Sequence, residues 1–186
     1  HLSPKVLDRV QVLRFRNPML TDWDAIENEV EKARQALPED RFVLRMTPED
    51  IGARAEYPAF DRTDGSVAFL SRLSKQYLDP LGVEFGLRPI RQAQGYIIAA
   101  KAAGIDLDEA LDNVIKHKML PKIAFDTARP SGSGRPRRDI LEGLRSELAQ
   151  RFAGTSVVQE ESCVSDIARM ISMAEGNNGI VNYWQR

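Results

Sequence analysis

Residue types that build disulfides, zinc centres and membrane spans are scarce in this chain. Its single cysteine, Cys163, excludes an internal disulfide and a cysteine-built zinc site. This usage is typical of a reducing compartment, so we expect a cytoplasmic protein. No apolar run approaches the ~20 residues that span a bilayer, and we expect no membrane association. The net charge is −1, so the bulk charge does not indicate nucleic-acid binding.

The sequence also lacks the short motifs that bind nucleotide phosphates. Neither the Gly-x-x-x-x-Gly-Lys-[Ser/Thr] loop nor the Gly-x-Gly-x-x-Gly fingerprint occurs. A cysteine–histidine nucleophile pair would need Cys163, but this residue lies among apolar residues of an expected helix, and we expect it to be buried and structural. Because no acid, base and nucleophile come together in the sequence, we expect no enzymatic activity from this chain alone.

Two further polar features have structural explanations. His117 lies between two lysines near an expected helix end, where a positive charge suits the helix dipole, so we expect a capping or solvated side chain. A group of acids could bind a cation, but acids in a first helical turn more often interact with the helix dipole. We therefore predict no metal site at this group, which consists of Asp106, Asp108, Glu109 and Asp112.

The spacing of apolar residues predicts a mainly α-helical bundle with one or two short strands. Helical periodicity, with caps before it and glycine or proline after it, covers about 22–37, 64–81, 89–104, 106–120, 139–154 and 162–176. The expected N-caps are Asp64, Asp106, Asp139, and either Ser162 or Ser165. Residues 42–46 form a short apolar stretch that favours a strand, and residues 180–184 favour either an edge strand or a docked segment. A short helix is expected from Thr47.

Four parts are expected along the chain. Residues 1–16 combine a proline-started turn with a strand-like stretch and look like the end of a larger domain. Residues 17–128 hold the first helices. Residues 129–138 are rich in Gly, Ser, Pro and Arg, which predicts an exposed, flexible linker. Residues 139–186 are expected to form a C-terminal helical extension.

Arginines are the residues with the clearest functional interest. Arg9 lies where a helical turn meets a strand, and Arg88 lies just before a proline-started helix; from either position a guanidinium can be held toward a phosphate. By local sequence alone, a structural ion pair or a solvated side chain is the favoured interpretation at both positions. In the linker, nucleic-acid phosphates could be contacted by Arg135, Arg137 and Arg138, although a solvated linker is the plainer interpretation.

Three segments resemble parts of a known family in the same order. The segments are residues 2–9 with the apolar stretch to Phe15, residues 85–92, and residues 107–112 continuing to Leu-Pro-Lys-Ile at 120–123. They are similar to segments of McrB-like AAA+ NTPases of the restriction type. They look like the segment after the first sensor, the start of the second-sensor helix, and the end of the following acidic helix. Ala124, Phe125 and Asp126 depart from the small or polar residues usual in the family after that ending.

The resemblance implies that the chain is the end of a nucleotide-binding core followed by a helical lid. Arg9 would correspond to an arginine finger that points toward a neighbouring subunit's nucleotide. Arg88 would correspond to the second sensor at the terminal phosphate, with Arg91 as a competitor for this role. The phosphate loop, the acidic metal-binding strand and the first-sensor residue do not occur here, so this part alone should not hydrolyse nucleotide.

The expected partners follow from the same resemblance. The remainder of the parent AAA+ protein would supply ATP or GTP with Mg, a ring homo-oligomer is expected, and a nuclease subunit and DNA are expected partners of a restriction or translocation system. The alternative is a stand-alone helical module that binds a protein or, through its arginine linker, DNA. A small enzyme with a pocket of scattered residues receives little support.

Overall fold

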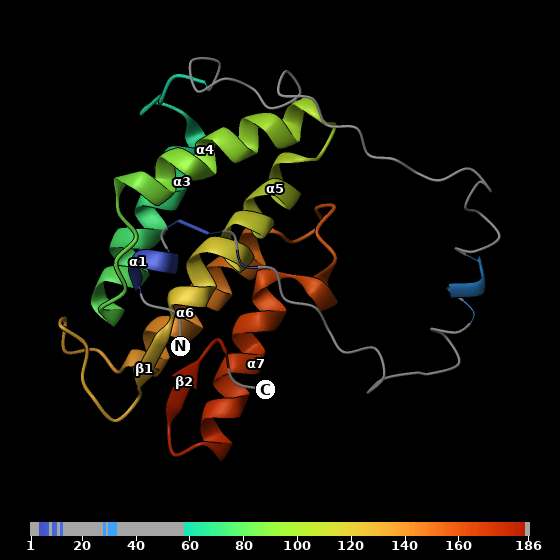
Figure 1. Ribbon diagram of the computed structural model, residues 1–186. Coiled ribbons are helices and arrows are strands. Elements are labelled where there is room, and N and C mark those ends of the chain that lie inside the picture. Colours follow the sequence, from blue (N-terminus) through green and yellow to red (C-terminus); the bar gives the residue numbers. More distant parts are fainter. Residues whose placement is uncertain are drawn as a thin grey trace. The chain divides into compact units, whose positions relative to one another are not determined.

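The computed structural model describes residues 4–7, 9, 10, 12, 28, 30–32 and 58–184. This part of the chain is mainly helical, with a two-stranded antiparallel sheet, as the sequence predicted (Figure 1). The expected helix over 22–37, the strand over 42–46 and the short helix from Thr47 fall almost wholly outside the described residues. None of the helices in the described part is long and apolar enough to cross a bilayer.

Short helical pieces continue several of the longer helices. In chain order the elements are α1 (Pro4–Leu7), α3 (Gly65–Leu73), the π-helix η4 (Ser74–Leu78), the 3₁₀-helix η5 (Asp79–Leu81), α4 (Leu87–Ala102), α5 (Leu107–Val114), the π-helix η6 (Ile115–Met119), the 3₁₀-helix η7 (Leu120–Lys122), β1 (Ala124–Asp126), α6 (Arg137–Arg151), the 3₁₀-helix η8 (Gln159–Glu161), α7 (Cys163–Gly176) and β2 (Ile180–Asn182). Both π-helices lead into a 3₁₀ turn with proline near its start, which ends the helix because proline cannot donate the next hydrogen bond.

Three of the expected N-caps are confirmed. The Asp64 carboxylate accepts from the amides of Ser66 and Val67, and the Asp106 carboxylate accepts from the amide of Asp108. The Ser162 hydroxyl accepts from the amide of Ser165, which decides between the two serines. Each cap satisfies amides that the first helical turn leaves without a partner.

The cap expected at Asp139 is wrong. Helix α6 begins two residues earlier, at Arg137, and Pro136 is its N-cap without a side-chain hydrogen bond. Asp139 lies in the first turn, where its charge still suits the positive end of the helix dipole. Pro136 occupies the N-cap with a non-helical ψ of 131°, and the residues from Arg137 onward are helical, so the helix has already begun before Asp139.

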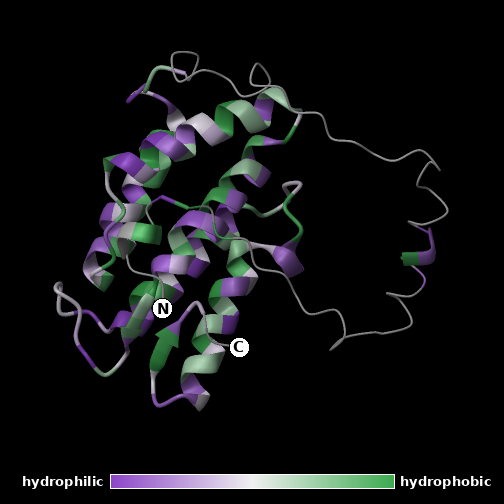
Figure 2. Cartoon of the chain, viewed as in Figure 1, coloured by the Kyte–Doolittle hydropathy of each residue, from purple (hydrophilic) through white to green (hydrophobic). Residues whose placement is uncertain are grey.

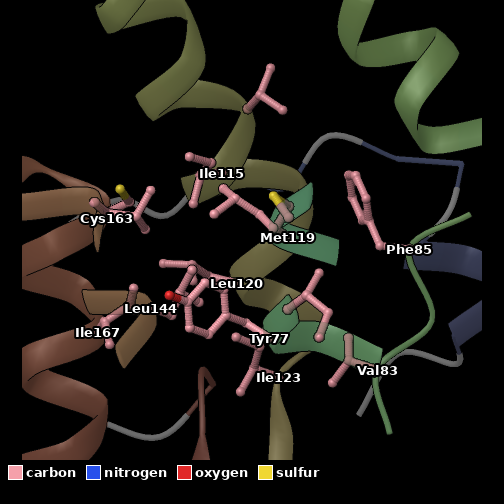
Figure 3. Close-up of a cluster of buried hydrophobic side chains, with 14 of the residues drawn as sticks. Tyr77, Val83, Phe85, Ile115, Met119, Leu120, Ile123, Leu144, Cys163 and Ile167 are labelled. Atoms are coloured by element: carbon pink, nitrogen blue, oxygen red, sulfur yellow. The ribbon is translucent and has the colours of Figure 1, made fainter. Parts of the chain in front are cut away.

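One hydrophobic core joins the elements of residues 58–184. The apolar and polar residues of the helices lie on different faces (Figure 2). In Figure 3, Ile115, Met119 and Leu120 lie between Cys163 and Ile167 on one side and Val83 and Phe85 on the other; all of these side chains are buried. Leu7 of α1 belongs to the same core. Cys163 is fully buried, which confirms the expected structural cysteine.

The C-terminal helices pack on the earlier ones. Helix α6 contacts α7, and it also contacts η4 and η5 at the end of α3. Strands β1 and β2 pair antiparallel, with Phe125 opposite Val181, so the tail joins residues 124–126. Of the two forms expected near residue 180, the strand is thereby confirmed. The domain limits expected at residues 16, 128 and 138 stay a prediction.

The expected linker contains a closed turn. A bridge pairs Pro130 with Pro136, the Ser131 amide donates to the Arg135 carbonyl at 3.3 Å, and Ser131 is buried. Gly134 adopts φ +76°, a left-handed conformation that glycine allows at little cost. The turn leads directly into α6.

Candidate functional site at the start of α4

The first turn of α4 offers two backbone amides to a ligand, those of Leu87 and Arg88, because Pro89 has no N–H and the Ile90 amide donates to the Gly86 carbonyl at 3.4 Å. Its N-cap is Gly86, which offers no side-chain hydrogen bond, and the first turn contains no acid. The 16-residue helix therefore presents a positive dipole end that no helix residue compensates. Glu84 precedes the helix, and its carboxylate lies beside the N-cap, with Oε1 3.9 Å from the position that a Cβ on Gly86 would take. The backbone carbonyl of Glu84 accepts from Lys122 Nζ at 3.0 Å.

Arg88 lies on this first turn and is exposed to solvent. Among the described residues no hydrogen bond or ion pair of its side chain is found. Arg91 is also exposed, but its guanidinium lies over the Phe60 ring, 5.6 Å from the ring centre. Phe60 is held there because the Asp61 amide donates to Gln94 at 3.1 Å and Gln94 donates back to the Asp61 carbonyl at 2.9 Å. Of the two sensor candidates, Arg88 is thus the one without such a contact.

Two lysines reach this region from η6 and η7. Lys118 Nζ donates to the side chain of Gln92 at 2.7 Å, and Lys122 Nζ lies 5.4 Å from the centre of the Phe85 ring. Both lysines have partners, yet their charges add to the positive end of α4. Local sequence patterns do not reveal these lysines, because 26 positions separate Lys118 from Gln92. Only the fold brings the two segments together.

Arg9 follows α1 and is exposed as well. Its amide donates to the Val6 carbonyl at 2.9 Å, which closes the turn after the helix. Leu7 is buried in the core, and α1 contacts η7. Element η7, which contains Lys122, therefore also contacts the helix that precedes Arg9. Among the described residues the Arg9 side chain has no ion pair.

The role expected for His117 is wrong. Its side chain is half-buried, and Nδ1 lies 2.7 Å from the Val12 carbonyl oxygen. Burial lowers the pKa of His117 below its ordinary value, and the charge of Lys116 lowers it further, against the raising effect of the Val12 hydrogen bond and of Asp112 and Asp166. The neutral imidazole is favoured, so His117 is not a solvated or capping cation.

The linker arginines differ from one another. Arg138 bonds Glu142 at 3.0 Å and Glu175 at 2.5 Å, and these two hydrogen bonds raise the pKa of its guanidinium. The Arg137 guanidinium lies over the Phe125 ring at 5.9 Å from its centre, and Arg135 is exposed. Because two carboxylates offset its charge, Arg138 is poorly suited to attract a phosphate backbone.

Three of the four acids considered for a metal have partners within the protein. The Asp112 side chain is buried and accepts from the Cys163 amide at 2.7 Å, so it caps α7 from α5. Asp108 forms an ion pair with Arg151, and Asp106 caps α5. Over the residues that the structure describes, no three ligand-type side chains gather in a way that could hold a metal ion.

The family described as "Domain of unknown function (DUF8727)" matches residues 49–179. The chain belongs to the DUF8727 family. The match includes the start of α4, with Arg88 and Arg91, and it includes the arginine-rich turn before α6; Arg9 lies outside the matched residues. No curated protein and no solved structure matches the chain.

Proposed function

We propose that this DUF8727 chain is the C-terminal helical lid of a AAA+ NTPase that resembles the McrB-like restriction family. In this role Arg88 senses the terminal phosphate of the nucleotide bound under its own lid. Arg9 acts as a finger toward the nucleotide of a neighbouring subunit in a ring. The remainder of the parent protein supplies the phosphate loop, the Mg and the ATP or GTP, and a nuclease subunit and DNA are partners of the whole assembly. We place this assembly in the cytoplasm.

The observation that carries the proposal is the local environment of the Arg88 side chain. The side chain is exposed on the first turn of a long helix whose N-cap makes no side-chain hydrogen bond and whose first turn contains no acid, although the Glu84 carboxylate lies beside the N-cap. The Arg88 guanidinium and the amides of Leu87 and Arg88 are donors of the kind that bind a phosphate. Arg91 is the weaker candidate, because its contact with Phe60 would have to be given up.

The chemistry at such a site would be electrostatic. A guanidinium beside the terminal phosphate stabilises the charge that spreads over this phosphoryl group during transfer. When the phosphate leaves, the arginine loses its partner, and the lid is free to rotate relative to the core. In this proposal the nucleophile, the base and the metal ligands come from the remainder of the parent protein.

The experiment measures nucleotide binding and hydrolysis by the full-length parent protein. Arg88→Ala is compared with Arg145→Ala, which removes an exposed arginine of α6 that has no ion pair among the described residues. We expect Arg88→Ala to weaken nucleotide binding by about tenfold, the equivalent of one charge-assisted hydrogen bond, and Arg145→Ala to have no effect. Nucleotide binding by Arg91→Ala tests whether Arg91, rather than Arg88, is the sensor. If Arg88→Ala and Arg145→Ala bind nucleotide equally well, Arg88 is not the sensor.

A further inference from the structure

Two hydrogen bonds join Val12 to His117 across 105 positions of sequence. The Val12 amide donates to the His117 carbonyl at 3.2 Å, and His117 Nδ1 lies 2.7 Å from the Val12 carbonyl oxygen. A carbonyl oxygen only accepts, so Nδ1 must carry the proton and donate. The imidazole is therefore held in one tautomer. We refer to these two bonds as the Val12–His117 pair.

The Val12–His117 pair lies close to Arg9 in the sequence. Leu7, two residues before Arg9, is buried in the core, and Val12, three residues after it, is buried at 8% exposure. Arg9 itself is exposed between these two anchors. A side chain that projects from backbone fixed on both sides keeps its direction, because little conformational freedom remains to be lost on binding.

We propose that His117 is a positioning residue for Arg9: its Nδ1–H bond to Val12 holds the segment on η6, so that Arg9 keeps a fixed place relative to Arg88. This inference rests on the function proposed above. Elements η6 and η7 also carry the lysines that reach the start of α4, so both arginines are attached to one support. A movement of the lid then moves the finger as well, which passes the nucleotide state of one subunit to its neighbour.

Two substitutions of His117 separate the hydrogen bond from the bulk of the ring. In His117→Asn the side-chain amide nitrogen lies close to the position of Nδ1 and still donates to Val12. In His117→Gln the longer side chain places the amide near the position of Nε2, away from the Val12 carbonyl. The Asn variant is thus the conservative control. The Gln variant removes the hydrogen bond while keeping a side chain of similar polarity.

The first measurement is hydrogen exchange of the Val12 amide in the full-length parent protein. Loss of one hydrogen bond corresponds to about a fivefold change in the local opening equilibrium. We expect exchange about fivefold faster in His117→Gln than in the wild type, and close to the wild-type rate in His117→Asn. If both variants exchange at the wild-type rate, His117 does not hold this segment, and the inference is overturned.

The second measurement is the steady-state hydrolysis of ATP or GTP by the same variants. We expect His117→Gln to lower kcat at an unchanged KM, since Arg9 acts on the neighbour's transition state, and His117→Asn to restore kcat. In an Arg9→Ala background, His117→Gln should cause no further loss. An additional loss in that background overturns the positioning role.

The two measurements also separate this inference from the proposed function. In one outcome, Arg9→Ala leaves hydrolysis unchanged while His117→Gln still speeds hydrogen exchange at Val12. The contact between His117 and Val12 is then confirmed, but Arg9 is not a finger, and His117 has no positioning role. If Arg88→Ala leaves nucleotide binding unchanged while the Arg9 and His117 results appear as expected, the sensor role alone fails.

Discussion

Tyr77 and Glu147, which are 70 positions apart in the sequence, are joined by a 2.6 Å hydrogen bond from the phenol to Oε2 of the carboxylate. Arg72 forms an ion pair with the other oxygen of Glu147, and Gln76 Nε2 donates to the phenol oxygen at 3.0 Å. Burial raises the pKa of Tyr77 to about 12, and the hydrogen bond to Glu147 adds to this shift. The group connects the end of α3 and η4 to α6, and it therefore ties the C-terminal helices to the earlier ones.

Removing the Tyr77 hydroxyl should destabilise the fold. Tyr77→Phe keeps the buried ring but leaves the half-buried carboxylate of Glu147 without its donor from η4. We expect a loss of about 1–2 kcal/mol in the free energy of unfolding, measured by denaturant titration. Tyr96→Phe, at an exposed tyrosine of α4, is the control and should change stability by less than about 0.5 kcal/mol. Equal effects of both changes would contradict a structural role for the bond.

The lowered pKa of His117 predicts a pH dependence of stability. The unfolded chain titrates near the ordinary histidine value of about 6.5, whereas the folded chain takes up this proton only at lower pH. As the pH falls below that ordinary value, the unfolded state binds more protons, and the free energy of unfolding decreases until the folded state is also protonated. His117→Asn cannot titrate, so the difference in stability between wild type and variant should change across this pH range. A difference that stays constant with pH would contradict the assignment.

Local signals in the sequence were sufficient for the starts of α3, α5 and α7. Asp64, Asp106 and Ser162 cap their helices because the cap depends on amides only two or three residues away. The apolar periodicity likewise located α4 and α7, and Cys163 was correctly expected to be buried. These features need no knowledge of distant segments.

Contacts between distant segments determine the environments of His117, Arg88 and Arg91, which local patterns could not predict. His117 is neutral because the segment at Val12 covers it, and Arg91 differs from Arg88 because Phe60 lies beside it. Both partners come from parts of the chain that local patterns could not place near η6 or α4. The start of α6 was misjudged for a local reason, since the helix has already begun at Arg137, before the aspartate.

Two glycines in helices offer a matched test of packing. A Cβ at Gly95 of α4 would meet nothing within 4 Å, whereas a Cβ at Gly143 of α6 would lie 3.2 Å from the Tyr77 ring. Gly95→Ala should stabilise the fold by about 0.5–1 kcal/mol, because alanine loses less backbone freedom in a helix. Gly143→Ala makes the same helical gain but crowds a buried ring, so it should be less stable than Gly95→Ala in thermal unfolding. The reverse order would contradict the packing of Tyr77 against α6.

The Cys163 thiol should react only when the fold opens. Burial raises its pKa well above the ordinary value, and the nearby charge of Asp112 raises it further, so the thiolate is scarce. We expect labelling by an aromatic disulfide reagent to be at least about a thousandfold slower in the native chain than in denaturant. Fast labelling of the native chain would show that α7 opens locally at its first turn.

The isolated chain should neither hydrolyse nucleotide nor bind DNA strongly, and this pair of assays separates the proposed lid from a stand-alone DNA-binding module. The chain lacks a phosphate loop, and the charge of Arg138 is offset by Glu142 and Glu175. Phosphate release is measured with ATP and with GTP, and DNA binding is measured by fluorescence anisotropy at two salt concentrations. Tight binding that weakens steeply with salt would favour the module, because each released counterion contributes to that slope. Robust hydrolysis by the pure chain would contradict both interpretations.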